Sequence, residues 1–346
     1  MAFTVAMVLP FQGPGGIYGP SAEAITELAV SEINADGGVL GDQINTIMVD
    51  GGAPRSQVHA EVSRLLTEDK IQAVSGWHIS SVRNALAPLV AGRIPYLYPS
   101  LYEGGEQRSG VYCTGEVPSN QLEPAMRWLR NQQNVRKWFV VGDNYVWPRQ
   151  TYAALKDRVT EQGIEFVGSS FIEGSQHIDT ALDSISKSSC EGVLMLLVGH
   201  NAAVFNRAFS ARGLHEKMIR LSPLMEENTL LASGSEATVG IFSTAAYFRS
   251  LVTMDAMDLM SRYHRRQGVT APMLNSPAES CYEALYGLRH LVDRAGSSNV
   301  KDIDAKIDGT AFSAGRGTVV FEGNQLRQPL YLAEADGLDF DVVATL

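Results

Sequence analysis

The first 34 residues decide the fold: FTVAMVL (Phe3–Leu9), a Gly/Pro-rich loop (Pro10–Pro20) and SAEAITELAVSEIN (Ser21–Asn34) follow one another. The apolar run Phe3–Leu9 is typical of a strand that is buried on both faces, and such strands belong to parallel sheets. In Ser21–Asn34 the apolar side chains recur at helical spacing, and the pair Gly37-Gly38 ends the pattern. The chain therefore begins with a strand, a loop and a helix of a parallel α/β sheet.

The same alternation continues along the chain. It predicts strands at Ile44–Asp50, Ala73–Ser75 and Pro95–Pro99, separated by helices Ser56–Glu68 and Ser80–Ala91. A second series follows the polar segment Gly115–Gln121, with helices Leu122–Asn131, Arg149–Gln162, Thr180–Lys187 and Ala202–Arg212 and strands Lys137–Gly142, Glu165–Phe171, Gly192–Leu197 and Ile219–Leu221. Alternation of this kind indicates two doubly wound, Rossmann-like α/β lobes.

The last third of the chain has to be shared between the two lobes. It contains predicted helices Met254–Arg266 and Ala278–Ala295 and predicted strands Gly317–Glu322 and Gln328–Glu334. Because these late helices need a sheet to cover, we expect three short hinge crossings, near Gly115–Gln121, Ala246–Ser250 and Glu322–Arg327. Lobe one would comprise residues 1–118 plus 250–322, and lobe two residues 119–249 plus 323–346. Two such lobes would form a clamshell with a ligand cleft between them.

Composition narrows the function. The 346 residues carry 28 Lys plus Arg against 38 Asp plus Glu, which gives a net charge of 28 − 38 = −10. That balance argues against direct nucleic-acid binding. With 45% hydrophobic and 19% charged residues, the chain is neither disordered nor fibrous. The widely spaced Cys113, Cys190 and Cys281 fit reduced thiols better than a zinc cluster or a disulfide framework.

No familiar catalytic or cofactor motif is present. The loop Gly13–Gly19 has the position of a dinucleotide-binding loop, but Tyr18 stands where the third glycine is required, and Asp50 lies too far along. The G-x-S-x-G, H-E-x-x-H and P-loop motifs are missing. We therefore expect no cofactor, no metal and no catalytic residue, and we interpret the glycine-rich loop as a tight turn.

Aromatic and small polar residues gather where predicted strands end. Trp77-His78-Ile79-Ser80-Ser81 follows the third strand, Tyr96-Leu97-Tyr98-Pro99-Ser100 closes the fourth, and Asn144-Tyr145-Val146-Trp147 follows the first strand of lobe two. Each ring taken alone fits core packing at least as well. Their joint position favours a pocket of stacked rings and hydroxyl groups for a small, mostly neutral polar ligand.

Five stretches resemble a known family: SEINADGGVLG (Ser31–Gly41), YPSLYEGGE (Tyr98–Glu106), GEVPSNQ (Gly115–Gln121), GDNYVWPR (Gly142–Arg149) and AAYF (Ala245–Phe248). They are similar to type I periplasmic-binding-protein folds of the branched-chain amino-acid-binding group. Within that group they most resemble the amide and urea receptors, which include regulators of aliphatic amidase operons. The similarity extends over nearly the whole chain.

The resemblance implies a non-catalytic receptor that closes on a short amide or a urea-like ligand. The residues it places at the ligand are His78, Ser80, Tyr98, Ser100, Tyr102, Tyr145, Trp147 and Glu227. A buried amide needs a carboxylate or hydroxyl for its nitrogen, for which Glu227 and Ser100 are suited, and it needs donors for its oxygen.

The role of such a receptor stays open at this stage. As a sensor it would signal to a regulatory protein in the cytoplasm, and the chain as given shows no signal peptide. As the solute-binding subunit of an ABC transporter for amides, urea or branched-chain amino acids it would be periplasmic or lipid-anchored and would meet a permease. An amide-processing enzyme that uses Glu103, Glu227 or Cys113 is the rival from another class, and a homo-oligomer formed through the late helices is a further expectation.

Overall fold

A computed structural model describes residues 2–346 of the chain. It divides into two compact units, each an α/β layer structure, which confirms the expected fold class. Unit 1 consists of the residues up to Leu101, Gly105–Gly115 and Val252–Pro329. Unit 2 consists of Tyr102–Gly104, Glu116–Leu251 and Leu330–Leu346.

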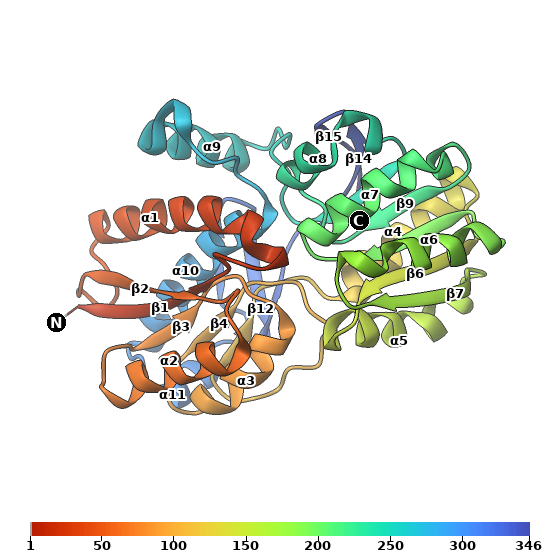
Figure 1. The fold of residues 1–346 in the computed structure, drawn as a ribbon. Helices are drawn as coiled ribbons and strands as arrows, with labels where there is room; N and C mark the ends of the chain where they lie inside the picture. Colours follow the sequence, from red (N-terminus) through yellow and green to blue (C-terminus); the bar gives the residue numbers. More distant parts are fainter. Residues whose placement is uncertain (1) are drawn as a thin grey trace. The chain divides into compact units, whose positions relative to one another are not determined.

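Unit 1 is built on an eight-stranded sheet of order β11-β12-β13-β5-β4-β3-β1-β2. Its strands are β1 (Phe3–Leu9), β2 (Ile44–Asp50), β3 (Ala73–Ser75), β4 (Tyr96–Tyr98), β5 (Val111–Cys113), β11 (Ala311–Ala314), β12 (Gly317–Glu322) and β13 (Gln325–Arg327). Its helices are α1 (Gly19–Ala35), α2 (Arg55–Thr67), α3 (Ser80–Val90), α9 (Met254–Gln267), α10 (Ser276–Ala295) and α11 (Val300–Asp304). Helices α1 and α10 pack together on one face of the sheet, and α2 and α3 cover the other (Figure 1).

Unit 2 is built on a seven-stranded sheet of order β15-β14-β10-β9-β8-β6-β7. Its strands are β6 (Lys137–Asp143), β7 (Glu165–Ile172), β8 (Gly192–Leu196), β9 (Ile219–Ser222), β10 (Ile241–Ala245), β14 (Tyr331–Asp336) and β15 (Asp339–Thr345). Its helices are α4 (Pro118–Gln133), α5 (Val146–Thr160), α6 (Ile178–Lys187), α7 (His200–Ala211) and α8 (Glu227–Ser233). Helices α4 and α5 form one pair, and α6, α7 and α8 form a second row.

Both sheets have the same topological switch. In unit 1, β1 pairs in parallel with β2 on one side and with β3 on the other. In unit 2, β6 pairs in parallel with β7 and with β8. The two helices that leave such a pair of neighbouring strands lie on opposite faces, so a crevice opens at the carboxyl ends of these strands. The switch therefore marks, in each unit, the place where a ligand is expected.

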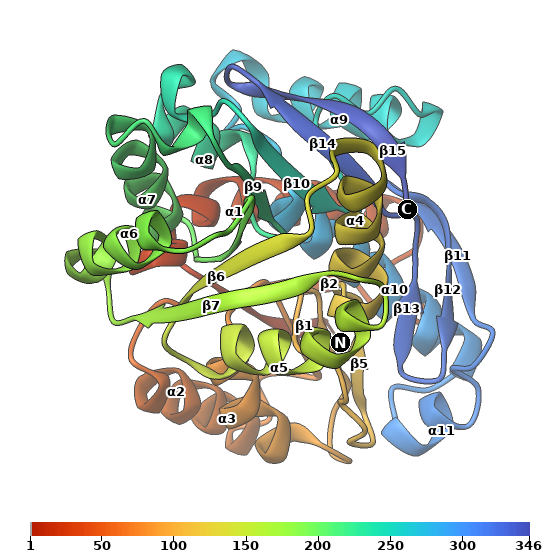
Figure 2. The same cartoon turned by 90° about the vertical axis from the view of Figure 1, so that its right-hand side faces the viewer.

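The late strands differ from the expectation. The predicted strand Gln328–Glu334 is found as β14 with shifted bounds: β13 ends at Arg327 in unit 1, and β14 begins at Tyr331 in unit 2 and ends at Asp336. Pro329 lies between them, and proline has no N–H to give to a sheet. The antiparallel hairpins β11–β12 and β14–β15 at the sheet edges (Figure 2) were only partly predicted, since β11 and β15 were missed.

The division of the chain also differs from the expected residues 1–118 plus 250–322 and 119–249 plus 323–346. Val117 and Pro118 belong to unit 2, because α4 starts at Pro118. The return to unit 2 comes at Leu330 instead of after Glu322, because β13 pairs with β12 and β5 in the sheet of unit 1. Tyr102–Gly104 forms a short extra excursion that is counted with unit 2.

Helix α8 provides a direct test of this packing, because two adjacent leucines have opposite environments. Leu230 is fully buried in the core of unit 2, whereas Leu231 is 56% exposed. We predict that Leu230→Ala lowers the free energy of unfolding by about 2–5 kcal/mol, because the cavity it leaves cannot collapse fully. Leu231→Ala should change it by less than about 0.5 kcal/mol. Urea unfolding followed by circular dichroism measures both, and equal losses would contradict this orientation of α8.

Candidate functional site

Four of the predicted ligand residues lie together at the carboxyl ends of two neighbouring strands of unit 1. His78 and Ser80 follow β3, Tyr98 is the last residue of β4, and Ser100 follows it. None of the four is more than 2% exposed. We call this group the unit 1 edge. It is adjacent to the switch between β1 and β3.

His78 connects three segments of the unit 1 edge. Its Nδ1 lies 3.1 Å from the carbonyl oxygen of Val8, at the end of β1. Its Nε2 lies 2.5 Å from the hydroxyl of Tyr96 in β4. The hydroxyls of Tyr98 and Ser100 both donate to the His78 carbonyl, each at 2.8 Å, and the His78 N–H donates to Ser100 Oγ at 2.9 Å.

These partners fix the protonation of the ring. A carbonyl oxygen can only accept, so Nδ1 carries the proton and Nε2 accepts from the Tyr96 hydroxyl. Burial lowers the pKa of His78 to about 4, so that the imidazole is neutral at physiological pH. Both ring nitrogens are engaged within unit 1. His78 is therefore placed to position Tyr98 and Ser100.

A buried arginine, Arg83, contacts the ring of Tyr98. The Arg83 guanidinium lies 5.2 Å from the centre of the Tyr98 ring, which is cation–π distance. Its Nε lies 3.6 Å from a carboxylate oxygen of Glu106, and both side chains are at most 4% exposed. Arg108 approaches the same carboxylate at 2.8 Å. The Glu106 carboxylate thus lies between the Arg83 and Arg108 guanidinium groups next to the unit 1 edge.

Asp143, the last residue of β6, lies at the topological switch of unit 2 and connects the two strands that form it. Its carboxylate accepts from the N–H of Val198 at 2.9 Å and from the Asn201 side chain at 2.7 Å, both just beyond β8. Burial raises the pKa of Asp143 to about 6, although these hydrogen bonds oppose the shift. Asp143 thereby holds the carboxyl ends of two strands at the switch.

Three predicted ligand residues follow strands of unit 2, and with Asp143 they form what we call the unit 2 edge. Tyr145 and Trp147 come after β6, with ring centroids 6.2 Å apart; Tyr145 is half-buried and Trp147 is 3% exposed. Glu227 is the first residue of α8, beyond β9, and is 1% exposed.

Glu227 has an unusual environment for a carboxyl group. Its Oε1 accepts the N–H of Arg249 at 2.8 Å, which ties α8 to the segment after β10. Burial raises the pKa of Glu227 to about 7, with the Arg249 N–H acting in the opposite direction. The group can therefore donate or accept a hydrogen bond near neutral pH, which suits it to an amide nitrogen or an amide oxygen.

The last predicted residue, Tyr102, lies with unit 2 and not in lobe one, where it was expected. Its N–H donates to the carbonyl of Glu116 at 2.9 Å, and its side chain is 3% exposed. Glu116 in turn accepts the N–H of Ala246 at 3.1 Å.

Sequence reasoning missed Arg83, Glu106 and Asp143 as parts of these edges. It named Tyr96 among the aromatic residues at the end of the fourth strand but not among the ligand residues, although Tyr96 lies two residues before Tyr98 and residues i and i+2 of a strand share a face. Asp143 also lies in the quoted GDNYVWPR stretch. The pairing of Arg83 with Glu106 brings together positions 23 residues apart and had no local signal.

Asp50 and the three cysteines, which the sequence analysis singled out, lie outside the two edges. Asp50 accepts the N–H of Phe11 and of Gly52, each at 2.9 Å, and so closes the turn that was expected in place of a dinucleotide loop. The three cysteines are free and buried, as expected for reduced thiols. Residues 2–346 contain no cluster of His, Cys, Asp and Glu suited to a metal ion, and no helix among them is long and apolar enough for a membrane span.

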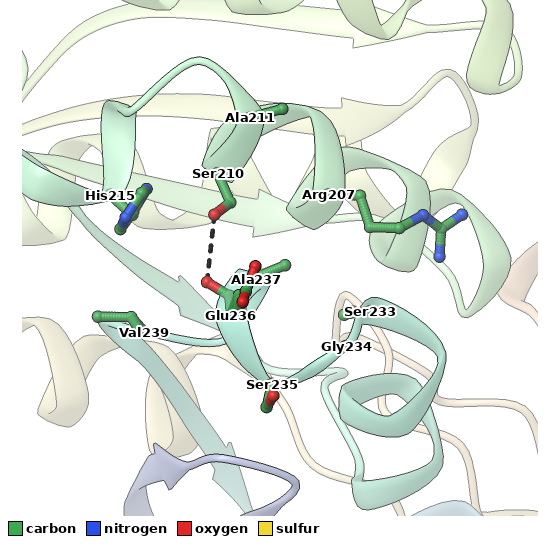
Figure 3. Close-up of a pocket in the computed structure, with 10 residues that line it drawn as sticks. All are labelled: Arg207, Ser210, Ala211, His215, Ser233, Gly234, Ser235, Glu236, Ala237 and Val239. Carbon is green, nitrogen blue, oxygen red and sulfur yellow. Dashed lines mark hydrogen bonds between the residues drawn. The ribbon is translucent and has the colours of Figure 1, made fainter.

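A surface pocket of about 840 Å³ in unit 2 lies away from these edges (Figure 3). It opens between α7 and the turn after α8, where Ser210 Oγ donates to the Glu236 carbonyl at 3.1 Å. No residue of the unit 2 edge lines it. It is therefore a groove separate from the switch.

Comparison with known proteins agrees with this arrangement. A family model described as periplasmic binding protein matches residues 2–339. A Leu/Ile/Val-binding protein, BraC3 of Rhizobium johnstonii, is 24% identical over 329 residues, which cover 90% of this chain and 84% of that protein.

Solved structures have the same fold. A solute-binding protein of an ABC transporter from Rhodopseudomonas palustris, in complex with p-hydroxybenzoic acid, has a TM-score of 0.89 at 18% identity and covers 100% of this chain and 97% of its own. LivJ of Streptococcus pneumoniae, in complex with isoleucine, has a TM-score of 0.82 at 18% identity, with coverages of 100% and 99%. Members of this family bind small molecules and are not enzymes. With a family model that spans almost its whole length, the chain belongs to the periplasmic binding proteins.

Proposed function

We propose that this chain is the solute-binding subunit of an ABC transporter for a small, neutral, N–H-bearing solute such as a short amide or urea. The observation that carries the proposal is the chemistry of the two edges. They bring buried hydroxyls, aromatic rings and the Glu227 carboxyl to the switch points, where α/β sheets bind their ligands.

The charge at the two edges favours a neutral solute. His78 is neutral, Arg83 is paired with Glu106, and Arg249 is paired with Asp339. A free carboxylate would thus meet no unpaired buried cation among these residues, while Asp143 and Glu227 would repel it when ionised. Burying a charge without a partner is costly, so amino acids and benzoates should bind less well than amides.

The relatives favour transport over signalling. The sequence first suggested a sensor that reports to a regulatory partner, but several structures with this fold are described as solute-binding proteins of ABC transporters. We accordingly propose a permease as the partner, and the periplasmic alternative in place of a cytoplasmic location.

A ligand screen tests the proposed class. We predict that butyramide, acetamide or urea raises the melting temperature of the purified protein, because a ligand that binds only the folded state stabilises it by about 2.7 kcal/mol at 100 times Kd. Leucine and 4-hydroxybenzoate serve as carboxylate controls, and ammonia release is assayed in parallel.

Each negative result removes a different part of the proposal. Stabilisation by leucine or 4-hydroxybenzoate alone would overturn the amide class but keep the receptor. Ammonia release that is lost in Glu227→Gln would overturn the receptor in favour of an enzyme.

Two adjacent serines test the unit 1 edge. Ser80, the first residue of α3, is 2% exposed, whereas Ser81 is only half-buried. We predict that Ser80→Ala weakens binding of the best amide about tenfold, through the loss of one hydrogen bond worth ~1.4 kcal/mol. Ser81→Ala should leave Kd within about twofold. Isothermal titration calorimetry measures both, and equal effects would remove Ser80 from the site.

The raised pKa of Glu227 makes stability depend on pH. Since its pKa is about 7 in the folded chain against an ordinary value of 4.5, the folded state holds this proton more tightly than the unfolded state. Stability from this group is therefore present below pH 4.5 and is lost as the pH rises through 7, by about 3 kcal/mol in total.

We predict that Glu227→Gln removes this loss, because the amide oxygen still accepts the Arg249 N–H and no charge forms. Urea unfolding at pH 5 and pH 8 should show a smaller decline for Glu227→Gln than for the unaltered protein. The exposed Glu216→Gln is the matched control in the same unit. Identical pH profiles for all three proteins would contradict the buried state of Glu227.

A further inference from the structure

The main chain passes between the units at three principal places: after Gly115, after Leu251 and after Pro329. Two of these segments start side by side within unit 1. β5 and β13 are parallel neighbours, with Gln325 opposite Cys113, so Thr114–Gly115 and Gln328–Pro329 leave the sheet in the same direction. Gln325 Nε2 also donates to the Gly115 carbonyl at 2.8 Å.

Arg316 lies beneath both segments, in the turn between β11 and β12. Its side chain is 1% exposed and donates in three directions at once. Nε donates to the carboxylate of Glu279, one Nη donates to Ser280 Oγ at 2.5 Å, and the other donates to Gln328 Oε1 at 2.5 Å. Gln328 Nε2 then donates to the Thr114 carbonyl at 3.1 Å. A continuous hydrogen-bonded path thus runs from α10 through Arg316 to the last residues before two crossings.

The same turn also contacts the third segment. A Cβ atom on Gly315 would lie 2.4 Å from Leu259 Cδ2 and 2.7 Å from Glu279 Oε1, so only glycine fits between them. Leu259 belongs to α9, which begins at Met254, two residues after the chain enters unit 1 at Val252. The Gly315–Arg316 turn therefore also packs against α9, the first helix after the third crossing.

The chemistry of the turn requires arginine. A planar guanidinium can bridge a carboxylate, a hydroxyl and an amide oxygen at fixed angles, whereas the ammonium group of lysine is a single point on a flexible stem. Glu283, one turn along α10, is fully buried nearby, and burial together with Glu279 raises its pKa well above the ordinary value. Glu279 is the carboxylate that pairs directly with the Arg316 guanidinium.

We propose that Arg316 is a positioning residue that fixes the angle at which the crossing segments leave unit 1, and thereby sets the balance between open and closed arrangements of the protein. This inference rests on the proposed receptor function, in which the units move when a solute binds. Arg316 itself touches no solute. It acts through Gln328 and Thr114.

Distance measurements in the absence of any solute test the proposal. The native cysteines are buried, so spin labels can be attached selectively to Thr67→Cys in unit 1 and Ser184→Cys in unit 2, both of which are exposed. Pulsed electron–electron double resonance then gives the distribution of distances between the two labels. The same protein without introduced cysteines controls for stray labelling.

The test uses two conservative substitutions. The more drastic Arg316→Met is avoided, because it removes the partner of a buried carboxylate and can unfold unit 1. Gln328→Met cuts the link to Thr114 but leaves the ion pair with Glu279. Arg316→Lys keeps the charge but cannot bridge all three partners. We expect both to change the ratio of short to long distances by on the order of tenfold, a size usual for coupling between separate sites. The unfolding midpoint of Gln328→Met should stay at that of the unaltered protein.

Arg289→Met is the matched control, since Arg289 pairs with Asp36 at 2.7 Å and with Asp293 at 3.4 Å, both within unit 1. It should leave the distance distribution unchanged. Unaltered distributions in both Gln328→Met and Arg316→Lys would overturn the proposal, as would an equal change in Arg289→Met. Because no solute is present, this result is independent of the ligand screen, so the two proposals can fail separately.

Discussion

The buried hydrogen bonds of His78 are the constraint on which the unit 1 edge depends. One neutral imidazole joins the end of β1 through Val8 to β4 through Tyr96, and its carbonyl receives the hydroxyls of Tyr98 and Ser100. A buried polar network of this kind is stable only when each member has its partner, because an unmatched group costs about 1–3 kcal/mol. The positions of the side chains at the edge are therefore mutually dependent.

In unit 2, buried carboxyl groups join separate segments, as the imidazole of His78 does in unit 1. Asp143 joins β6 to the residues beyond β8, and Glu227 joins α8 to the segment after β10. Both acids are held by N–H donors of the chain, and burial raises the pKa of each towards neutrality. Unit 1 thus offers a neutral surface and unit 2 an acidic one that is readily protonated. This difference gives a physical reason to prefer a neutral N–H-bearing solute over the carboxylates that are bound to several proteins of the same fold.

The hydrogen-bond network of Arg316 concerns the crossings of the main chain and not the ligand chemistry. It is internal to unit 1, yet it ends on the residues that carry the chain into unit 2. Buried ion pairs contribute little net stability compared with apolar packing, so their value lies in fixing one geometry among several. A guanidinium that is held on three sides is well suited to that task.

The sequence by itself determined most of the elements and their order, but not the strands β5, β10, β11, β13 and β15. The apolar run Phe3–Leu9 and the amphipathic stretch Ser21–Asn34 became β1 and α1, because burial on both faces and burial on one face leave different periodicities. It also placed His78, Ser80, Tyr98 and Ser100 after the correct strands, since the ends of parallel strands meet at one edge. The start of the strand predicted at Gln328 was placed too early, since β14 begins at Tyr331, because Pro329 at a crossing leaves no pattern of its own. Only the tertiary structure decided that His78 is neutral and bonded on both sides, that Arg83 is paired with Glu106, and that Arg316 reaches Gln328. These properties depend on burial and on partners distant in sequence, and no local pattern of residues records either.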